Sequence, residues 1–403
     1  MTFIKYLYKA ANRAGHTVEG IIEAADRKAV LFALRSKSLY LLELSEVAQK
    51  VSLDIQIGSP KIPKKVLAVF CTQFASILKA GVPLVQALNI LTEQTEHKQL
   101  QKILVTVNEE LQAGKGLSES LSAHDKALPP IMIKLIEAGE MSGTLDLSLQ
   151  RLAVQFEKDY KLQKKVKGAM TYPTIVGVVA VLVVIFLLVF IMPKFTAIFS
   201  TMKTEMPGIT KFFLSLSDFV VHDWMYLLGF IALFIVLFRF YKGSVVGQTQ
   251  IDGMKLKLPV VKKAMARILS ARFARTLATL TASGVSLTQS LRIASKVVAN
   301  KVAENRLIDI EEQIKRGVSL HAAISKETMF PKMMMHMTKI GEESGTLDQM
   351  LEKAADYFED EAESSIDKLT SLLQPIMLVL VAVIVLMIML SVMLPMFSIY
   401  SSV

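Results

Sequence analysis

The chain has 403 residues, of which 52% are hydrophobic and 20% are charged, and its formal net charge is +10. This much apolar surface exceeds what a soluble core needs, so part of the chain is expected to lie in lipid. In a membrane protein, excess Lys and Arg are explained first by topology and anionic headgroups, so we expect no nucleic-acid partner. The single cysteine, Cys71, excludes an intrachain disulfide and is expected to be a small core residue.

Residues 1–50 are predicted to form a small N-terminal α/β module, expected on the cytoplasmic side. Alternating residues over 18–24 and an apolar run over 39–44 predict two strands, and a helical pattern follows Asp26. The first residues lack an apolar core followed by a cleavage site, so we expect no signal peptide to be removed. A polar linker with Gly and Pro, residues 51–65, separates this module from the rest of the chain.

Residues 66–171 are predicted to form a first bundle of antiparallel helices. Phe70 and Phe74 recur on one helix face, and Gly81 followed by Pro83 is typical of the end of one helix and the start of the next. Further helices are predicted over 100–111, 117–121, 131–138 and 145–160. Because the connecting turns are short, consecutive helices are expected to pack antiparallel.

The octet GEMSGTLD at residues 139–146 is predicted to join two of these helices. We expect Gly139 to end one helix, Ser142 or Thr144 to cap the next, and Asp146 to lie in its first turn, where the helix dipole favours an anion. A turn that contacts a partner remains an alternative. The neighbouring carboxylates, Glu140 among them, would also allow a metal or an acid–base pair, but the helix–turn–helix interpretation explains more of the octet.

Three segments are long and apolar enough to cross a bilayer, which takes about 20 residues. The predicted order is a first crossing over 172–193, an external loop over 194–219, a second crossing over 220–241, a cytoplasmic linker over 242–264, a second bundle over 265–372, a third crossing over 373–395 and an external tail over 396–403. No crossing has an ionisable residue in its middle, whereas ion and substrate pathways normally need one.

Basic residues gather on one side of these crossings. Before the first lie Lys158, Lys161, Lys164, Lys165 and Lys167, and after the second lie Arg239, Lys242, Lys255, Lys257, Lys262 and Lys263. By the positive-inside rule, the N-terminus and both bundles are expected to be cytoplasmic, and the short loop and the C-terminus outside.

The chain is an internal duplication. The octet returns as GEESGTLD at residues 341–348, an offset of 202, so Gly341, Glu342, Ser344 and Gly345 repeat Gly139, Glu140, Ser142 and Gly143. Other matched pairs are Phe156 and Phe358, Pro173 and Pro375, Pro193 and Pro395 and, at an offset of 203, Phe70 and Phe273, Gly81 and Gly284, and Gly114 and Gly317. Two copies of one helical unit therefore occupy most of the chain.

The sequence offers no convincing catalytic, cofactor or metal site. The run GKG at residues 114–116 lacks the spacing of a phosphate-binding loop and is predicted to be a turn between helices. The six histidines are scattered, with no HExxH pattern, and no GxSxG nucleophile motif is present. We therefore expect a protein that is not an enzyme and uses no cofactor.

Several motifs resemble those of one known family. The run KVKGAMTYP at residues 165–173, followed by an apolar stretch to Pro193, is similar to the signature of the type II secretion F family, with Tyr172 and Pro173 where the chain would enter the membrane and Pro193 where it would leave. The runs EAGEMSGTL (137–145), FCTQF (70–74) and AGVPL (80–84) also resemble family motifs. In the second copy Pro375 and Pro395 are kept, but Asp367 replaces Lys165 and Gln374 replaces Tyr172, so the copies are not expected to contact the same partner.

The resemblance implies a mainly α, multi-pass protein of the bacterial inner membrane, with two cytoplasmic bundles of about six helices each and three transmembrane helices. It implies a non-enzymatic platform protein of a type IV pilus, type II secretion or competence system. Such a platform couples a cytoplasmic hexameric ATPase to the extraction of pilins or pseudopilins and to filament growth, self-associates, and works with other inner-membrane assembly components.

On this interpretation, the ATPase would contact the bundles and the basic segments beside the membrane. The candidate residues are Lys158, Lys161, Lys164, Lys165, Lys167, Lys255, Lys257, Lys262 and Lys263. Solvated helix faces and membrane topology explain the same lysines without a partner. A membrane transporter built from repeats is the alternative function, which the lack of ionisable residues within the crossings disfavours.

Overall fold

The computed structural model describes residues 4–11, 17–24, 30, 40–46, 61–194 and 208–400. The chain forms two compact units, which meet in sequence between Pro60 and Lys61.

The first unit contains an antiparallel sheet of three strands. These are β1 (Ile4–Ala11), β2 (Thr17–Ala24) and β3 (Tyr40–Glu46), in the order β2-β1-β3. The two strands predicted from the sequence are β2 and β3. The central strand, β1, was not predicted, and the helix predicted after Asp26 lies outside the described residues apart from Val30.

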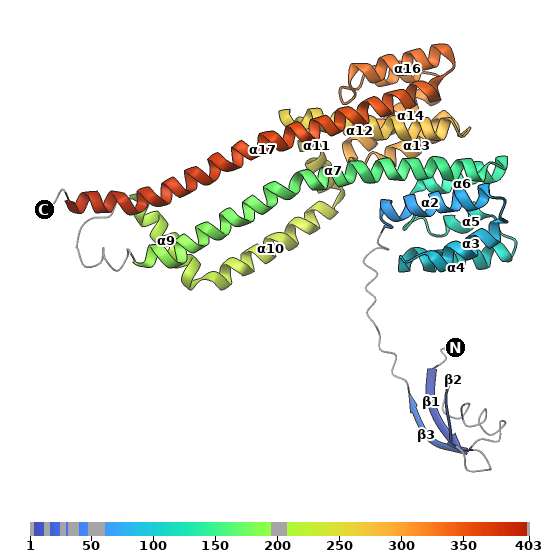
Figure 1. Ribbon diagram of the computed structural model, residues 1–403, viewed down its shortest axis with the longest axis horizontal. Coiled ribbons are helices and arrows are strands. Elements are labelled where there is room, and N and C mark those ends of the chain that lie inside the picture. Colours follow the sequence, from blue (N-terminus) through green and yellow to red (C-terminus); the bar gives the residue numbers. More distant parts are fainter. Residues whose placement is uncertain are drawn as a thin grey trace. The chain divides into compact units, whose positions relative to one another are not determined.

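The second unit begins with six helices that match the predicted first bundle (Figure 1). They are α2 (Lys64–Lys79), α3 (Leu84–Gln94), α4 (Lys98–Gln112), α5 (Leu117–Ser122), α6 (Pro130–Ser142) and α7 (Leu145–Phe186). Gly81 has a φ of +83°, which glycine adopts without strain, and Pro83 precedes α3 as predicted. Phe74 and Phe156 are fully buried in the core of this bundle, as is Cys71, whose thiol pKa is raised by burial.

Six further helices repeat this bundle. They are α12 (Pro259–Thr281), α13 (Leu287–Val297), α14 (Lys301–Lys315), α15 (Leu320–Ser325), α16 (Lys332–Ser344) and α17 (Leu347–Tyr400). Phe273 and Phe358, the repeat partners of Phe70 and Phe156, are again buried in the core.

An ion pair between the first and last helix also recurs, because Lys64–Asp159 (3.2 Å) in one copy corresponds to Arg267–Glu361 (2.6 Å) in the other. The duplication therefore extends to individual contacts.

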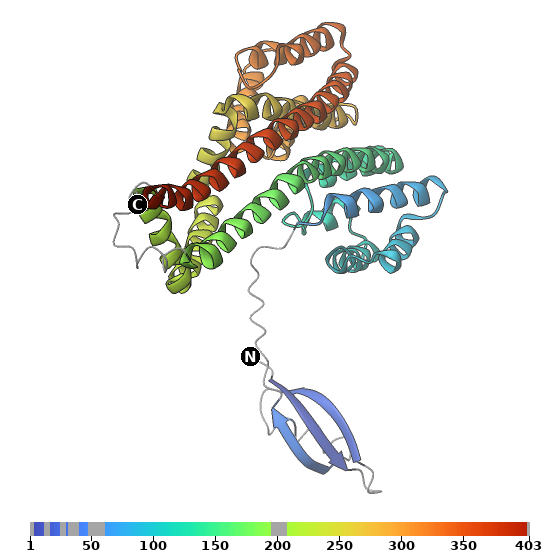
Figure 2. The same cartoon turned by 60° about the vertical axis from the view of Figure 1, so that its left-hand side comes forward.

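The last helix of each bundle runs without a break from the bundle into an apolar segment. Helix α7 has 42 residues and passes into a π-helical turn, η1 (Leu187–Ile191), while α17 has 54 residues. At 1.5 Å per residue their lengths are about 63 Å and about 81 Å. Together with α10 (Trp224–Gly243), they are the three helices of the described chain long and apolar enough to span a membrane (Figures 1 and 2).

The connections between the crossings contain more helix than predicted. Residues 208–222 form α9 (Gly208–His222), so residues 220–222 end α9 rather than begin the second crossing, which starts at Trp224. Asp223 separates the two helices because its backbone leaves the helical conformation. The predicted linker contains α11 (Val245–Lys257), whose first turn is capped by the Ser244 hydroxyl accepting from the Gly247 N–H at 3.0 Å.

Candidate functional site at the seam between the repeats

The repeated octet has a different internal structure from the one predicted. Gly139 lies inside α6 and does not end it; the helix ends at Gly143, which has a φ of +71°. A Cβ on Gly139 would lie 2.5 Å from the Ser148 Oγ, so this glycine allows α6 and α7 to approach closely. In the second copy, Gly345 ends α16 and Gly341 makes the close approach, with a hypothetical Cβ 2.8 Å from the Leu347 Cα.

Neither predicted hydroxyl caps α7. Thr144 occupies the position before the helix, but its side chain accepts no backbone hydrogen bond there, while Ser142 donates to the Ala138 carbonyl at 2.7 Å. Ser344 donates likewise to the Ile340 carbonyl at 2.7 Å. Asp146 lies in the first turn of α7 as predicted.

The sequence analysis missed the role of the octet's glutamate. Glu140 accepts hydrogen bonds from the Leu117 N–H (2.6 Å), the Ser118 N–H (2.9 Å) and the Ser118 hydroxyl (2.6 Å), and so caps the N-terminus of α5. Partial burial acts to raise the pKa of Glu140, but these hydrogen bonds outweigh it and hold the pKa below its ordinary value.

Glu342 caps α15 in the same way. It accepts from the Leu320 N–H at 2.5 Å and the His321 N–H at 2.8 Å, and its carboxylate lies 2.6 Å from the His321 Nδ1. The octet is therefore a joint that holds three helices of each bundle together. The signal that could have revealed this role is the recurrence of each glutamate 22 or 23 residues after the start of the short helix.

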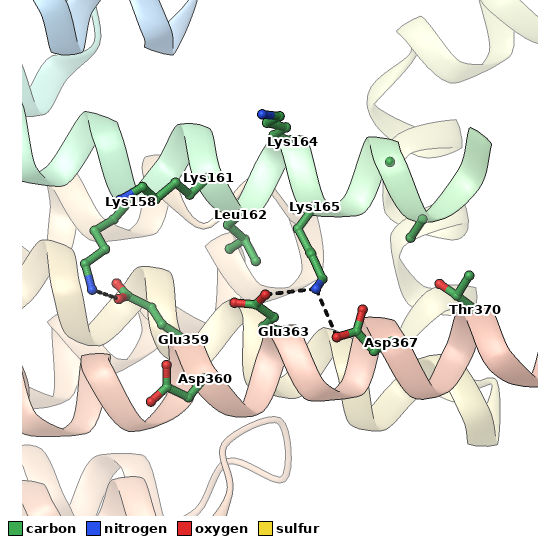
Figure 3. Close-up of a pocket in the computed structure, with 12 residues that line it drawn as sticks. Lys158, Lys161, Leu162, Lys164, Lys165, Glu359, Asp360, Glu363, Asp367 and Thr370 are labelled. Carbon is green, nitrogen blue, oxygen red and sulfur yellow. Dashed lines mark hydrogen bonds and ion pairs between the residues drawn. The ribbon is translucent and has the colours of Figure 1, made fainter. Parts of the chain in front are cut away.

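A set of ion pairs joins α7 to α17 where the two copies meet. Lys158 Nζ lies 2.8 Å from a Glu359 carboxylate oxygen (Figure 3). The same Nζ lies 3.4 Å from an Asp356 oxygen. One heptad further on, Lys165 Nζ lies 2.8 Å from Glu363 and 3.0 Å from Asp367. Hydrogen bonding to these carboxylates raises the pKa of both lysines. We call this set of residues the seam.

The two copies meet in this seam at equivalent positions. Lys165 and Asp367 are repeat partners, and their side chains form an ion pair with each other. If the second copy kept a lysine at position 367, two lysines would face each other here. Asp367 instead gives a pair of opposite charges. A cavity of about 610 Å³ runs along the seam, with lysines of α7 on one wall and carboxylates of α17 on the other.

Arg275 of α12 ties the seam to the second bundle. Its side chain is only 7% exposed, and its Nε lies 2.9 Å from Glu359, the carboxylate that also binds Lys158. A second ion pair joins Arg275 to Asp356. Burial acts to lower the pKa of Arg275, but Glu359 and Asp356 outweigh it and raise the pKa. No local pattern in the sequence links Arg275 with a carboxylate 84 residues away.

The first bundle also contacts the end of α12. Arg151 of α7 donates to the Ala282 carbonyl at 2.8 Å and to the Ser283 hydroxyl at 2.6 Å. Ala282 follows the last turn of α12, where free carbonyls and the helix dipole favour a cation. Arg151, Lys158 and Lys165 are separated by seven residues each, so they lie on one face of α7.

The other predicted basic residues lie outside the seam contacts. Lys161 pairs with Glu157 of its own helix at 2.7 Å, Lys255 pairs with Asp252 at 2.8 Å, and Lys164 points away from α17 (Figure 3). Lys167, Lys257, Lys262 and Lys263 form no ion pair with another described residue.

The predicted membrane signature lies within or directly after the long helices. Tyr172 is half-exposed on α7, Pro173 lies inside α7, Pro193 follows η1, and Pro375 and Pro395 lie inside α17.

Among the described residues, no group of three or more His, Cys, Asp or Glu side chains is placed to hold a metal ion.

Comparisons with known proteins match the repeats and the N-terminal module. The family described as "Type II secretion system (T2SS), protein F" matches twice, over residues 70–193 and 273–395, and the family's N-terminal domain matches residues 1–45. The chain belongs to the type II secretion system protein F family. The predicted resemblance is therefore confirmed.

Relatives in this family come from both pilus and secretion systems. The type IV pilus assembly protein PilC of Thermus thermophilus is 38% identical, covering 99% of this chain and 98% of the relative. The protein of the same name from Myxococcus xanthus is 32% identical, covering 99% and 96%. The type II secretion system protein F of Vibrio cholerae is also 32% identical, covering 92% of each chain.

Proposed function

We propose that this protein is an inner-membrane platform of a type IV pilus or related type II secretion machine. In this role it couples a cytoplasmic assembly ATPase to the extraction of pilins or pseudopilins and to filament growth. Support comes from membership of the protein F family and from relatives named for type IV pilus assembly and type II secretion. A pilus role is favoured because the 38% identical relative is a pilus assembly protein.

The observation that carries this proposal is the continuity of α7 and α17. Each helix begins at a joint inside its bundle and continues into a segment that can span the membrane. A helix is stiff, so a force applied to the bundle reaches the membrane segment without passing through a loop. In the proposed role, α7 and α17 would connect a cytoplasmic motor mechanically to the part of the machine inside the membrane.

The seam would be the place where the two copies move against each other. Its ion pairs at Lys158 and Lys165 are partly exposed, and exposed ion pairs contribute little each and are screened by salt. The bundle cores, in contrast, are closely packed around buried aromatic residues and are expected to move as bodies.

The proposed topology places the N-terminus and both bundles in the cytoplasm and the C-terminus outside. Since Lys158 and Lys165 are already bound to carboxylates of α17, the ATPase contact is proposed chiefly for the other lysines beside the membrane, which are unpaired among the described residues or paired only within their own helix. These are Lys161, Lys164, Lys167, Lys255, Lys257, Lys262 and Lys263. Pilins, other inner-membrane assembly components, lipids and further copies of this chain are the remaining proposed partners.

Deletion in a piliated or secreting cell tests the function. Loss of filaments, with the ATPase still soluble and active, is the expected result, and normal filaments would contradict the proposal. No structural observation favours a transporter, because the crossing segments have no ionisable residue in their middle.

Charge reversal tests the ATPase contact separately. Lys164→Glu with Lys167→Glu should reduce the amount of ATPase recovered with membranes, because it reverses the exposed charge next to the bilayer. Lys98→Glu with Lys102→Glu, at exposed positions of α4, is the matched control. If both double variants recruit the ATPase equally well, the contact does not involve the α7 lysines.

A further inference from the structure

Two prolines at repeat-equivalent positions remove backbone hydrogen-bond donors near the far ends of the long helices. Pro193 follows η1, and Pro395 lies inside α17. Proline has no N–H, so a carbonyl that would accept from it in a regular helix loses its partner. In an apolar, membrane-like environment water does not replace that partner, so another donor is needed.

In α17 the affected carbonyl is that of Ser391, because residue 395 would be its donor in an α-helix. The Thr210 hydroxyl of α9 donates to this carbonyl at 2.8 Å. Both Thr210 and Ser391 are buried. A side chain from α9 therefore supplies the donor that Pro395 lacks.

In the first copy the π-helical turn η1 changes which carbonyl Pro193 leaves without a donor, because hydrogen bonds in a π-helix reach five residues back instead of four. The Met192 N–H donates to the Leu187 carbonyl, five residues back, so the Leu188 carbonyl would have to accept from Pro193. The Ser217 hydroxyl of α9 donates to the Leu188 carbonyl at 2.6 Å, in a buried site. The same helix thus supplies the donor that Pro193 lacks.

The two hydroxyls lie on one face of α9, since Thr210 and Ser217 are seven residues, or two turns, apart. Phe213 and Leu214 of α9 lie between them in the sequence and are buried in a small apolar cluster with residues of both copies. Helix α9 therefore makes both polar and apolar contacts, with α17 and with the turn that follows α7.

We propose that α9 is a clasp that holds the far ends of the first and third crossing helices together. It does so by donating hydrogen bonds to the two carbonyls that Pro193 and Pro395 leave without a backbone donor. This explains why the segment between the first two crossings, expected to be a loop, contains a helix with two buried hydroxyls. The proposal is independent of the ATPase and of the platform function.

The first part of the test removes each hydroxyl in the full-length chain reconstituted in lipid nanodiscs. Ser217→Ala and Thr210→Val should each lower the melting temperature, whereas Ser217→Thr and Thr210→Ser, which keep a hydroxyl, should lower it less. Ser215→Ala is the matched control, because the exposed Ser215 hydroxyl donates only to the Lys211 carbonyl of α9 itself, at 2.9 Å. We expect no change for this control.

The second part asks whether restoring the backbone donor makes the hydroxyl dispensable. In a Pro193→Ala background, Ser217→Ala should lose most of its effect while Thr210→Val keeps its own. In a Pro395→Ala background the pattern should be reversed. This pairwise specificity is not expected if the hydroxyls merely fill space.

The proposal is overturned if Ser217→Ala and Thr210→Val are as harmless as Ser215→Ala. It is equally overturned if each proline substitution rescues both hydroxyl variants or neither. Should a variant be too unstable to melt, the fraction of folded chain recovered from membranes serves as the readout, with the same rescue pattern expected.

Discussion

The α7–α17 pair is held together in chemically different ways at its two ends. Near the bundles, the seam uses ion pairs whose lysines, Lys158 and Lys165, are 40% and 35% exposed. At the far ends, α9 contributes Thr210 and Ser217, each 1% exposed. Salt and water weaken exposed ion pairs, whereas a buried hydrogen bond in an apolar site has no alternative partner. We therefore propose that the pair can loosen at the bundle end while it stays closed at the far end.

The largest effect is expected at Arg275, the buried residue that ties the seam to the second bundle. Arg275→Met should destabilise the second bundle by about 3 kcal/mol, because Glu359 and Asp356 lose their buried cation. Denaturant unfolding of the full chain in detergent measures the change. Arg272→Met, on the same helix with one hydrogen bond to the Val298 carbonyl, is the control and should cost less. Equal losses would show that Arg275 does not organise the seam.

The next largest effect is expected in the clasp. Removal of either hydroxyl should cost about 2 kcal/mol, because a buried carbonyl is left without a hydrogen-bond donor, and the loss should be the same at low and high salt. If the stability loss disappeared in high salt, α9 would hold the helices by charge interactions, and the two ends would not differ in the way described.

Charge exchange in the seam should have a smaller effect that depends on salt. Lys165→Asp should lower stability at low salt, and adding Asp367→Lys should restore part of the loss, because the pair with residue 367 is then reversed while Glu363 still faces a like charge. Melting temperatures of the wild type, both single variants and the double variant form the test cycle. The absence of coupling at low salt would mean that the two side chains do not interact.

The smallest expected effect is the response of the seam to acid. Burial acts to raise the pKa of Asp356, but Arg275 and Lys158 outweigh it, so the pKa lies below its ordinary value of 3.8. A carboxyl with a lowered pKa stabilises the fold fully above its unfolded-state value, and this contribution is lost as the pH falls through the folded-state value. Stability attributable to Asp356 should therefore be constant well above pH 3.8 and decline as the pH falls below 3.8 towards the lowered folded-state pKa.

Asp356→Asn tests this response. The variant should flatten the acid limb of the wild-type stability profile, while Ser217→Ala should shift the whole profile and leave its shape unchanged. An acid limb that is identical in the wild type and in Asp356→Asn would contradict the assignment.

Features with a local signature were predictable from the sequence. Gly81 followed closely by Pro83 is a local pattern typical of a helix break, and the apolar crossings stand out by composition. The octet reveals the duplication because it recurs almost unchanged. For the same reason, the bundles and the three long apolar helices were predicted.

Contacts between distant residues could not be predicted in this way. Gly139 was expected to end α6. In the structure it lies inside the helix, where a larger side chain would collide with Ser148 of α7. Glu140 caps a helix more than 20 residues earlier, and Thr210 reaches a carbonyl in α17. The sequence did contain one clue. The second copy has Asp367 where the first copy has Lys165, and opposite charges at equivalent positions are expected if these positions contact each other.

We propose that the seam moves while the protein works in filament assembly. Cysteines at Lys165 and Asp367 can be joined by a short bifunctional maleimide, and Cys71 should not compete because it is fully buried and burial raises the pKa of its thiol. Filament assembly is then measured in cells or membranes carrying the linked chain, with the unlinked double variant as control. We predict that the linked chain stays folded in the membrane and no longer supports assembly. Normal assembly by fully linked chains would contradict the account.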